Sequence, residues 1–335
     1  MNLQDPKYTR FALVREMMET PSVVRQFDNQ VVIPFAEQVK KKRALFLTGE
    51  GSSRIFPAKR AIYSAMQHND PIPVFTEGAT QALEYQLDDY AVFGASNSGK
   101  TKEIIRLLTK LKQKKHDALF GLTAHTGTKL EELTHRTHVL NCGNEDAVAA
   151  TKSVVEQALF YDVLQRRLLE KELCHCDNLA GDLEKSLTVQ IDDEMIRALK
   201  KAGRIFFAGR NDGVAEELTL KTNEITRKKS DYLEGTYAVH GIEEVMDADE
   251  VVVVIDPFES EEEKMTECLV KGVGMTVLAI ASRPTSFPTI IIPDNKQFAS
   301  YLQLAAGWNL LVEIGLALDI NLDKPVRARK VGNEF

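Results

Sequence analysis

Cysteine is scarce in this sequence, with four residues in a chain of 335. So few thiols over such a length do not supply the disulfide framework of a small secreted domain. Apolar runs are short as well, and none approaches the roughly 18 residues of a membrane-spanning helix. The start, MNLQDPKYTRF, has no basic segment followed by an apolar stretch. The sequence therefore predicts reduced thiols, no membrane contact and a cytoplasmic location.

Positive charge is also in deficit, because 42 Lys and Arg residues face 49 Asp and Glu residues. Nucleic-acid binding needs a positive surface, so no nucleic-acid partner is expected. The fragment Cys174-His175-Cys176 has no second Cys/His pair at ligand spacing, and neither a metal site nor a cofactor is predicted. Three further histidines flank a predicted helix and strand edge and are expected at the surface: His125, His135 and His138.

The chain length exceeds that of most single domains, so two domains are expected. Short apolar runs alternate with longer amphipathic stretches, which is typical of βαβ units and parallel sheets. The predicted strands are 44–48, 73–75, 90–94 and 118–122 in the first half, and 204–208, 251–255, 275–280 and 289–292 in the second. Long helices are expected over 148–173, 178–201 and 298–318, with a break at Asp177-Asn178.

This alternation predicts an α/β protein with two tandem three-layer αβα domains, each a parallel sheet flanked by helices. The predicted parts are an N-terminal helical arm (1–42), a first domain (43–175), a second domain (176–320) and a C-terminal tail (321–335).

The two halves look like a repeat. LFLTGEGSSRIFPAKRA at Leu45 has the order strand, Gly-rich turn, helix, and RIFFAGRNDGVAEELTLK at Arg204 repeats it. AVFGASNSGKTKEII at Ala91 is likewise matched by VVVVIDPFESEEEKM at Val251. The first of these two loops is rich in hydroxyls and glycine, whereas the second is acidic. A phosphate is therefore expected in the first half only.

The segment Gly94–Thr101 fits the G-x-x-x-x-G-K-T pattern of a nucleotide triphosphatase, between a strand and a helix. Val251–Asp256 resembles the apolar strand with a magnesium-binding aspartate that such an enzyme needs. That strand belongs to the other repeat, whereas a triphosphatase requires both elements on one sheet. The nucleotide function is therefore the least favoured, and an ordinary strand–turn–helix junction with capping hydroxyls is the structural alternative.

The segment Ser96–Glu103 also resembles the S-x-S-G-x-T-x-E signature of the sugar isomerase (SIS) family. It follows a strand and loop with Gly51-Ser52-Ser53, as in that family, and Glu145–Lys152 resembles the family segment E-x-x-V-A-S-T-K. Hydroxyls and free amides at a helix N-terminus hold a phosphate without a metal ion. The resemblance implies phosphate binding by Ser52, Ser53, Ser96, Asn97, Ser98 and Thr101, and substrate contacts from Val148, Ala149 and Ala150.

Within the family, the chain resembles the isomerase domains of glucosamine-6-phosphate synthases over nearly its whole length. LKTNEI at Leu220 resembles L-K-L-K-E-I, and NLDKPV at Asn321 resembles N-L-A-K-S-V. The resemblance implies that Glu224 shuttles a proton between C1 and C2, that His240 opens the sugar ring and that Lys324 engages the carbonyl. It also implies a homodimer with a shared active site, in which His240 serves either its own subunit or the neighbouring one.

The chemistry requires the same residue types. Moving a proton between adjacent carbons needs a carboxylate, a group with a pKa near neutrality for ring opening and a cation for the developing oxyanion. Lys221 and Glu224 are three residues apart on a predicted helix, so they share a face and can tune each other. Taken singly, such a pair is more often a surface pair, and a histidine such as His240 is usually solvated.

Several positions depart from the family pattern around the sugar, namely Asn97, Ala150, Tyr237, Val239 and Ile242. The chain begins Met1-Asn2, so no glutaminase domain with an N-terminal cysteine is expected. The predicted function is that of an aldose–ketose isomerase or deaminase acting on a hexosamine 6-phosphate. A fructosamine-6-phosphate deglycase and a non-catalytic sugar-phosphate sensor remain as alternatives.

Overall fold

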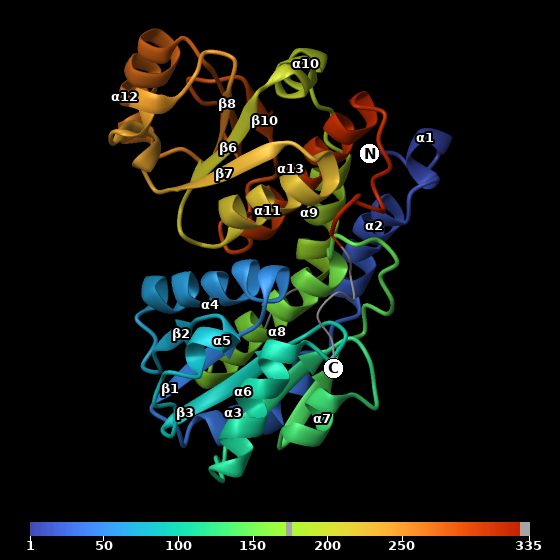
Figure 1. Cartoon of the computed structure of the whole chain (residues 1–335), viewed down its shortest axis with the longest axis vertical. Coiled ribbons are helices and arrows are strands. Elements are labelled where there is room, and N and C mark those ends of the chain that lie inside the picture. Colours follow the sequence, from blue (N-terminus) through green and yellow to red (C-terminus); the bar gives the residue numbers. More distant parts are fainter. Residues whose placement is uncertain (172–175, 329–335) are drawn as a thin grey trace. The chain divides into compact units, whose positions relative to one another are not determined.

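The computed structural model describes residues 1–171 and 176–328, which form two compact units (Figure 1). Among the described residues, the first-sheet unit consists of 22–145, 150–171 and 176–177, and the second-sheet unit of 1–21, 146–149 and 178–328. Each unit contains one parallel five-stranded sheet, which confirms the predicted α/β class. The boundaries 1–42, 43–175, 176–320 and 321–335 stay a prediction. Cys174 and His175 lie outside the described residues.

The sheet of the first-sheet unit has the order β2-β1-β3-β4-β5. Its strands are β1 (Ala44–Thr48), β2 (Val74–Thr76), β3 (Tyr90–Ala95), β4 (Leu119–Thr123) and β5 (Arg136–Val139). Its helices are η1 (Asn29–Val32), α3 (Ile33–Val39), η2 (Gly51–Ser53), α4 (Ile55–His68), α5 (Ala79–Ala82), α6 (Lys102–Gln113), α7 (Lys129–Leu133) and α8 (Lys152–Leu168).

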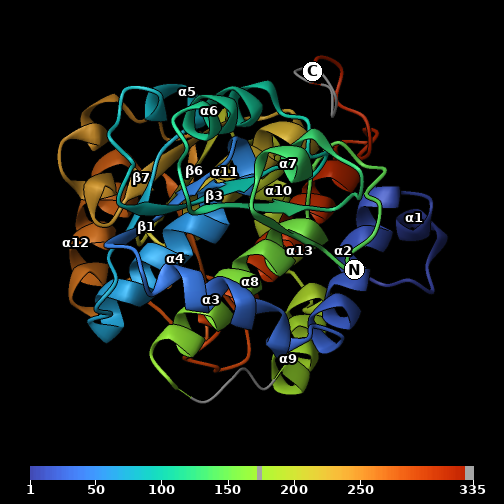
Figure 2. The same ribbon diagram turned by 90° about the horizontal axis from the view of Figure 1, so that it is seen from below.

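Helices cover both faces of this sheet (Figure 2). One face packs against α5, α6 and α7 through a buried cluster that includes Val92, Ile104 and Leu130. The other face packs against α3 and α8, where Phe35 contacts Phe93 at 6.0 Å and Phe160 at 5.1 Å between ring centroids. In α6 the buried residues Ile104, Ile105, Leu108 and Leu111 recur on one side, so burial against the sheet drives the formation of this helix.

The sheet of the second-sheet unit has the order β10-β9-β8-β6-β7. Its strands are β6 (Arg204–Gly209), β7 (Lys229–Glu234), β8 (Val251–Ile255), β9 (Thr276–Ala281) and β10 (Thr289–Ile291). The remaining helices of the chain are α1 (Pro6–Thr9), α2 (Ala12–Arg25), α9 (Cys176–Thr188), α10 (Asp193–Lys201), α11 (Val214–Thr226), η3 (Tyr237–Val239), η4 (Ile242–Val245), η5 (Glu259–Glu261), α12 (Glu262–Met265), the π-helix η6 (Thr266–Val273) and α13 (Ala299–Ala317).

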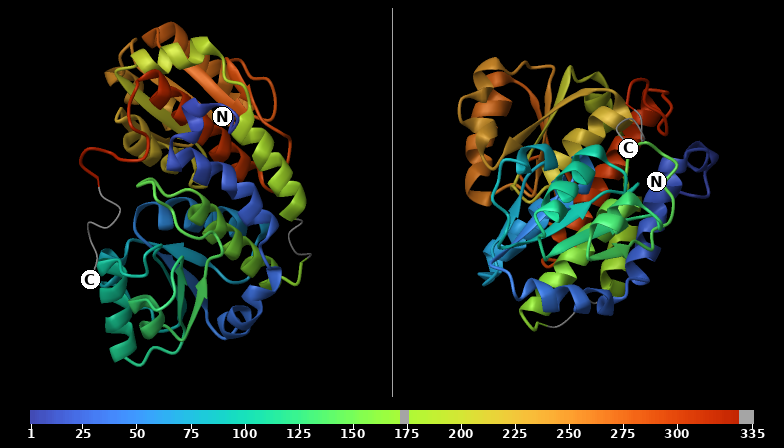
Figure 3. Two further views of the ribbon diagram at one scale, coloured as in Figure 1. Left: turned by 90° about the vertical axis from the view of Figure 1, so that its right-hand side faces the viewer. Right: turned by 60° about the horizontal axis from the view of Figure 1, so that its bottom comes forward.

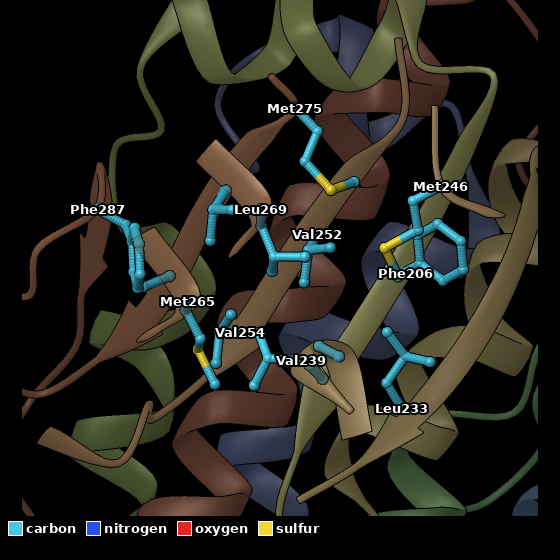
Figure 4. Close-up of a cluster of buried hydrophobic side chains, with 14 residues drawn as sticks. Phe206, Leu233, Val239, Met246, Val252, Val254, Met265, Leu269, Met275 and Phe287 are labelled. Atoms are coloured by element: carbon cyan, nitrogen blue, oxygen red, sulfur yellow. The ribbon is translucent and has the colours of Figure 1, made fainter. Parts of the chain in front are cut away.

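This second sheet is likewise covered by helices (Figure 3). On one face, a methionine-rich cluster joins β6, β8 and β9 to η3, α12 and η6 (Figure 4). Elsewhere in the unit α11 packs closely on α13. A Cβ added at Gly307 of α13 would lie 2.4 Å from a methyl carbon of Leu218 in α11, so the close approach requires glycine there.

The two sheets have the same topology, with β6 in the place of β1 and β8 in the place of β3. This is the pairing that the internal repeat predicts. Two edge strands, β5 and β7, were not predicted, because their residues are mostly polar and incompletely buried. The predicted helix break at Asp177-Asn178 is wrong, since α9 begins at Cys176 and runs through both residues. Over the described residues, no helix is both long and apolar enough to span a membrane.

The structure does not place His138 at the surface, where the sequence analysis expected it. Its ring stacks on Phe160 with centroids 5.1 Å apart, and Phe27 meets its edge. Its Nε2 atom is buried and has no hydrogen-bond partner among the described residues. Burial lowers the pKa of His138 to about 4. The surface assignment is therefore wrong for His138, whereas His135 is exposed.

We expect acid to destabilise the protein through His138. Between pH 6.5 and about 4 the unfolded histidine binds a proton that the folded one does not, so stability falls as the pH falls through this window. In a His138→Phe variant, which keeps the stacking but cannot titrate, the loss of unfolding free energy between pH 7 and pH 4.5 should shrink by about 1–3 kcal/mol. Urea unfolding at both pH values measures this. An exposed control, His68→Phe, should behave like wild type, and equal acid sensitivity in all three proteins would contradict the assignment.

Candidate functional site

The carboxyl ends of β1 and β3 form the topological switch point of the first sheet. The chain leaves β1 toward β2 on one side and leaves β3 toward β4 on the other. In open parallel sheets, ligands bind in the crevice that this divergence creates. Both hydroxyl-rich segments follow these two strands: Ser52 and Ser53 follow β1, and Ser96 to Thr101 follow β3. The fold thus brings the six predicted phosphate-binding residues to one edge of one sheet.

The loop after β3 is internally ordered. Ser96 is buried, and its Oγ lies 2.7 Å from Oγ1 of Thr101. Gly99 has a φ of 67°, and a Cβ there would lie 2.5 Å from Thr128, so only glycine fits. The Lys100 amide donates to Ser98 Oγ at 3.3 Å. Thr101 precedes α6 without a side-chain capping bond, which leaves the first amides of α6 available to an anion.

Glu145 is a buried carboxylate beneath this loop. It accepts hydrogen bonds from Asn97 Nδ2 at 3.2 Å, from the Thr151 amide at 2.7 Å and from Ser153 Oγ at 2.5 Å. Asn97 is therefore tied to the segment that precedes α8. The sequence pattern that contains Glu145 assigns this residue no role by itself, and the structure indicates that it positions Asn97.

The loop after β1 is equally tight. A Cβ at Gly49 would lie 2.7 Å from the carbonyl oxygen of Ser53, so the turn requires glycine. Ser52 is buried and Ser53 is partly exposed. Glu50 accepts a hydrogen bond from the Ala79 amide at 3.0 Å, and burial raises its pKa.

On α11 in the second-sheet unit, one lysine lies between two carboxylates. Lys221 Nζ is 2.9 Å from Glu224 Oε2 and 3.4 Å from Glu217 Oε1. Glu217 and Lys221 are fully buried, but the Glu224 side chain keeps 21% exposure. Glu224 is therefore the member of this cluster that a substrate can reach. The sequence interpretation missed Glu217, although its position one helical turn before Lys221 was a signal.

The segment with Lys324 is held against the same unit. The carboxylate of Asp323 accepts from the amides of Ala12 and Leu13 at the start of α2, at 3.0 and 2.8 Å. Its carbonyl oxygen accepts from the Val148 amide at 3.0 Å. Arg227, which ends α11, donates to the Lys324 carbonyl oxygen at 2.8 Å.

These bonds join the tail, Val148 and the end of α11, and Lys324 itself is exposed. Ala149 is buried in the same short segment, whereas Ala150 belongs to the first-sheet unit.

His240 follows η3 and is exposed. The residues before it, Ala238 and Val239, are buried in the methionine-rich cluster, and Val239 is labelled in Figure 4. Met246 anchors the chain again beyond η4 in the same cluster. The loop is therefore fixed at both ends while the imidazole stays accessible.

An ion pair lies at the switch point of the second sheet. Arg210 Nη1 lies 2.8 Å from Asp256 Oδ2, and the guanidinium stacks over Phe258 at 4.3 Å. Arg283 pairs with Glu259 at 3.2 Å and with Glu262 at 2.7 Å. In the described part of the chain, no three His, Cys, Asp or Glu side chains are grouped to hold a metal ion. The pairing of Asp256 with Arg210 argues against its use as a magnesium ligand.

Comparison with known proteins agrees with this architecture. Residues 38–166 match the family model of the SIS domain. No curated protein matches the sequence. The structure is similar to tagatose-6-phosphate ketose/aldose isomerase from Escherichia coli, with a TM-score of 0.79 and 17% identity over 97% of this chain and 99% of that one.

Two more solved structures are similar over nearly their whole length. The C-terminal domain of glucosamine-fructose-6-phosphate aminotransferase from Francisella tularensis has a TM-score of 0.76 and 16% identity, covering 94% of this chain and 98% of that one. Glucosamine-6-phosphate deaminase from Thermotoga maritima has a TM-score of 0.73 and 18% identity, covering 97% and 98%. At these identities the likeness is one of fold, and it includes both sheets. Residues 38–166 therefore form a SIS domain, and the chain as a whole has the fold of two tandem parallel-sheet units.

Proposed function

We propose that this protein is an enzyme that binds a sugar phosphate and moves a proton between neighbouring carbons of the sugar. The observation that carries the proposal is the group of hydroxyl side chains that follow β1 and β3 at the switch point of the first sheet. There the Thr101 side chain makes no capping bond to α6, and the buried carboxylate of Glu145 orders the loop. The second sheet has an ion pair in the corresponding place. One phosphate per chain is therefore proposed, in the first-sheet unit.

The phosphate would be held mainly by hydroxyls. Ser96 and Thr101 already share a hydrogen bond at 2.7 Å, so their geometry is fixed before a ligand arrives. Such preorganisation lowers the entropy that binding costs. The full proposed set is Ser52, Ser53, Ser96, Asn97, Ser98 and Thr101.

For the chemistry we assign Glu224 as the base. Its carboxylate is partly exposed and is oriented by the Lys221 ammonium at 2.9 Å. A proton shuttle needs a carboxylate with one fixed direction, and the buried Lys221–Glu217 pair supplies a rigid support for it. His240 would open the sugar ring and Lys324 would engage the carbonyl oxygen. Val148, Ala149 and Ala150 would line the substrate.

The substrate that we favour is a hexosamine 6-phosphate, with isomerisation or deamination as the reaction. Structural neighbours described as a ketose/aldose isomerase and as a deaminase support this choice. We also propose a cytoplasmic homodimer in which His240 serves the neighbouring subunit, because its imidazole is exposed on an anchored loop. Sedimentation analysis of the purified protein tests the dimer, and a monomer at micromolar concentration would contradict it.

A panel of sugar phosphates tests the function. Ammonia release from glucosamine 6-phosphate, aldose–ketose interconversion and fructosamine 6-phosphate cleavage are followed in parallel. We expect turnover of at least one compound, and Ser98→Ala should weaken its binding by roughly 10-fold or more, because it removes a hydrogen bond to a charged group. Thr109→Ala, on α6 but outside the crevice, is the control. Binding of a sugar phosphate without any turnover would favour a non-catalytic sensor. Thermal stabilisation by ATP with magnesium, but by none of the sugar phosphates, would contradict the proposal.

A further inference from the structure

A pocket of about 580 Å³ lies beside α6 in the first-sheet unit. Four cationic residues line it: Lys100 before α6, Arg106 and Lys110 on α6, and Lys129 at the start of α7. Its volume is in the usual range for small-molecule sites. In Figures 1 and 2, α6 and α7 lie side by side on the same face of the first sheet. The Leu130 amide also donates to the Gly99 carbonyl oxygen at 3.1 Å, which links α7 to the loop before α6.

All charged residues that line this pocket are cationic. No carboxylate lines it, although the chain as a whole has a net charge of −7. Lys110 donates to the Leu83 carbonyl oxygen at 2.6 Å, and Lys129 pairs with Glu132 at 2.5 Å. The side chains of Lys100 and Arg106 form no ion pair or hydrogen bond within residues 1–171 and 176–328. Two cations therefore remain available to an anion.

The residues of α6 that line the pocket run from Ile105 to Gln113. From Arg106 to Gln113, α6 advances by about 10 Å at the usual rise per residue. Ile105 and Thr109 line the wall between them, and Gln113 supplies an amide at the far end. An anion that fits this lining carries its charge near Lys100, Arg106 and Lys129 and lays a less polar body along Thr109 toward Gln113.

Lys100 also belongs to the phosphate loop. Its amide donates to Ser98 Oγ at 3.3 Å, while its side chain lines the pocket beside α6. This is the lysine of the G-x-x-x-x-G-K-T pattern, for which the proposed sugar-phosphate crevice gives no role. A ligand that holds the Lys100 side chain would act on the backbone of the loop that holds the sugar phosphate.

We propose that the pocket beside α6 binds an organic diphosphate at a second site, distinct from the crevice between β1 and β3, and that Lys100 couples the two. A diphosphate offers more acceptor oxygens than a monophosphate and so can engage Lys100, Arg106 and Lys129 together. Because coupling between two sites is reciprocal, a sugar phosphate must change the affinity for the diphosphate by the same factor as the reverse.

Calorimetric titration of the full chain with ADP, without magnesium, tests this site. We expect saturable binding below about 1 mM, weakened roughly 10-fold or more in Arg106→Gln and also weakened in Lys129→Gln, since each variant removes a charged hydrogen-bond donor. Lys114→Gln removes the same charge near the C-terminal end of α6 outside the pocket, and its affinity should equal that of wild type. Inorganic pyrophosphate should bind more weakly than ADP, because it lacks the body that lies along Thr109.

Four results would overturn the proposal. The first is an absence of saturable ADP binding, and the second is a loss of ADP affinity in Lys114→Gln as large as that in Arg106→Gln. The third is ADP binding that is weakened by Ser98→Ala but not by Arg106→Gln. The fourth is pyrophosphate binding as tight as that of ADP. Arg106 and Lys129 are both exposed, so folding does not depend on either, and thermal unfolding of each variant verifies this. Since the readout is binding rather than turnover, the result does not depend on the proposed reaction.

Discussion

Replacing Glu224 by glutamine should lower turnover of the best substrate by roughly 10²–10⁴-fold, the usual contribution of a general base. Glutamine keeps the size and the hydrogen-bonding atoms of the side chain but cannot take a proton. KM should change little, because the phosphate is proposed to bind at the loop after β3 in the other unit. The Glu224→Gln protein should therefore separate chemistry from binding.

Steady-state kinetics of the Glu224→Gln enzyme with the best compound of the sugar-phosphate panel measures this. The matched control is Glu216→Gln, which alters a carboxylate on the same helix outside the cluster of Glu217, Lys221 and Glu224. It should retain at least half of the wild-type turnover. Wild-type turnover in Glu224→Gln would exclude the residue as the base, and a rise in KM without a fall in kcat would instead assign it to substrate binding.

The central strands could be predicted from the sequence because they are buried on both faces. Val251–Ile255 is a continuous apolar run, and the predicted strand matches β8 residue for residue. The edge strand β7 was missed because its sequence, KSDYLE, is mostly polar, does not alternate polar with apolar residues and is only partly buried. The internal repeat contained the missing information, since a strand equivalent to β2 had to follow α11.

The residues of the candidate site likewise include some that the sequence predicts and some that it does not. The loop Ser96–Thr101 could be found because turn glycines and helix-capping hydroxyls leave a local sequence pattern. Glu145 and Glu217 could not, because a buried carboxylate is recognised by partners that folding brings to it. Glu145 receives Asn97 from a distant loop. Likewise the stacking of His138 on Phe160 depends on the packing of β5 against α8, which the sequence does not display.

The cluster on α11 should also contribute strongly to stability. Lys221 is fully buried between Glu217, which is fully buried, and Glu224. Removing one partner of a buried ion pair costs about 3–5 kcal/mol, because an uncompensated charge stays in the interior. Lys221→Met keeps a similar length and volume but leaves two carboxylates without their shared cation. We therefore expect the free energy of unfolding to fall by about 3–5 kcal/mol.

Urea unfolding near pH 7 measures the effect, with Lys185→Met as the control. Lys185 forms a pair of the same i,i+3 spacing with Asp182 at 3.0 Å, but its side chain is 69% exposed. Exposed pairs contribute about 1 kcal/mol or less, so this variant should lose little stability.

If Lys221→Met does not fold, the double variant Lys221→Met/Glu217→Gln provides the test, because it removes the buried negative charge together with its cation. The double variant should recover most of the lost stability. A loss in Lys221→Met no larger than that in Lys185→Met would show that the buried cluster does not stabilise the fold, and the rigid support proposed for Glu224 would then have to come from other contacts of α11.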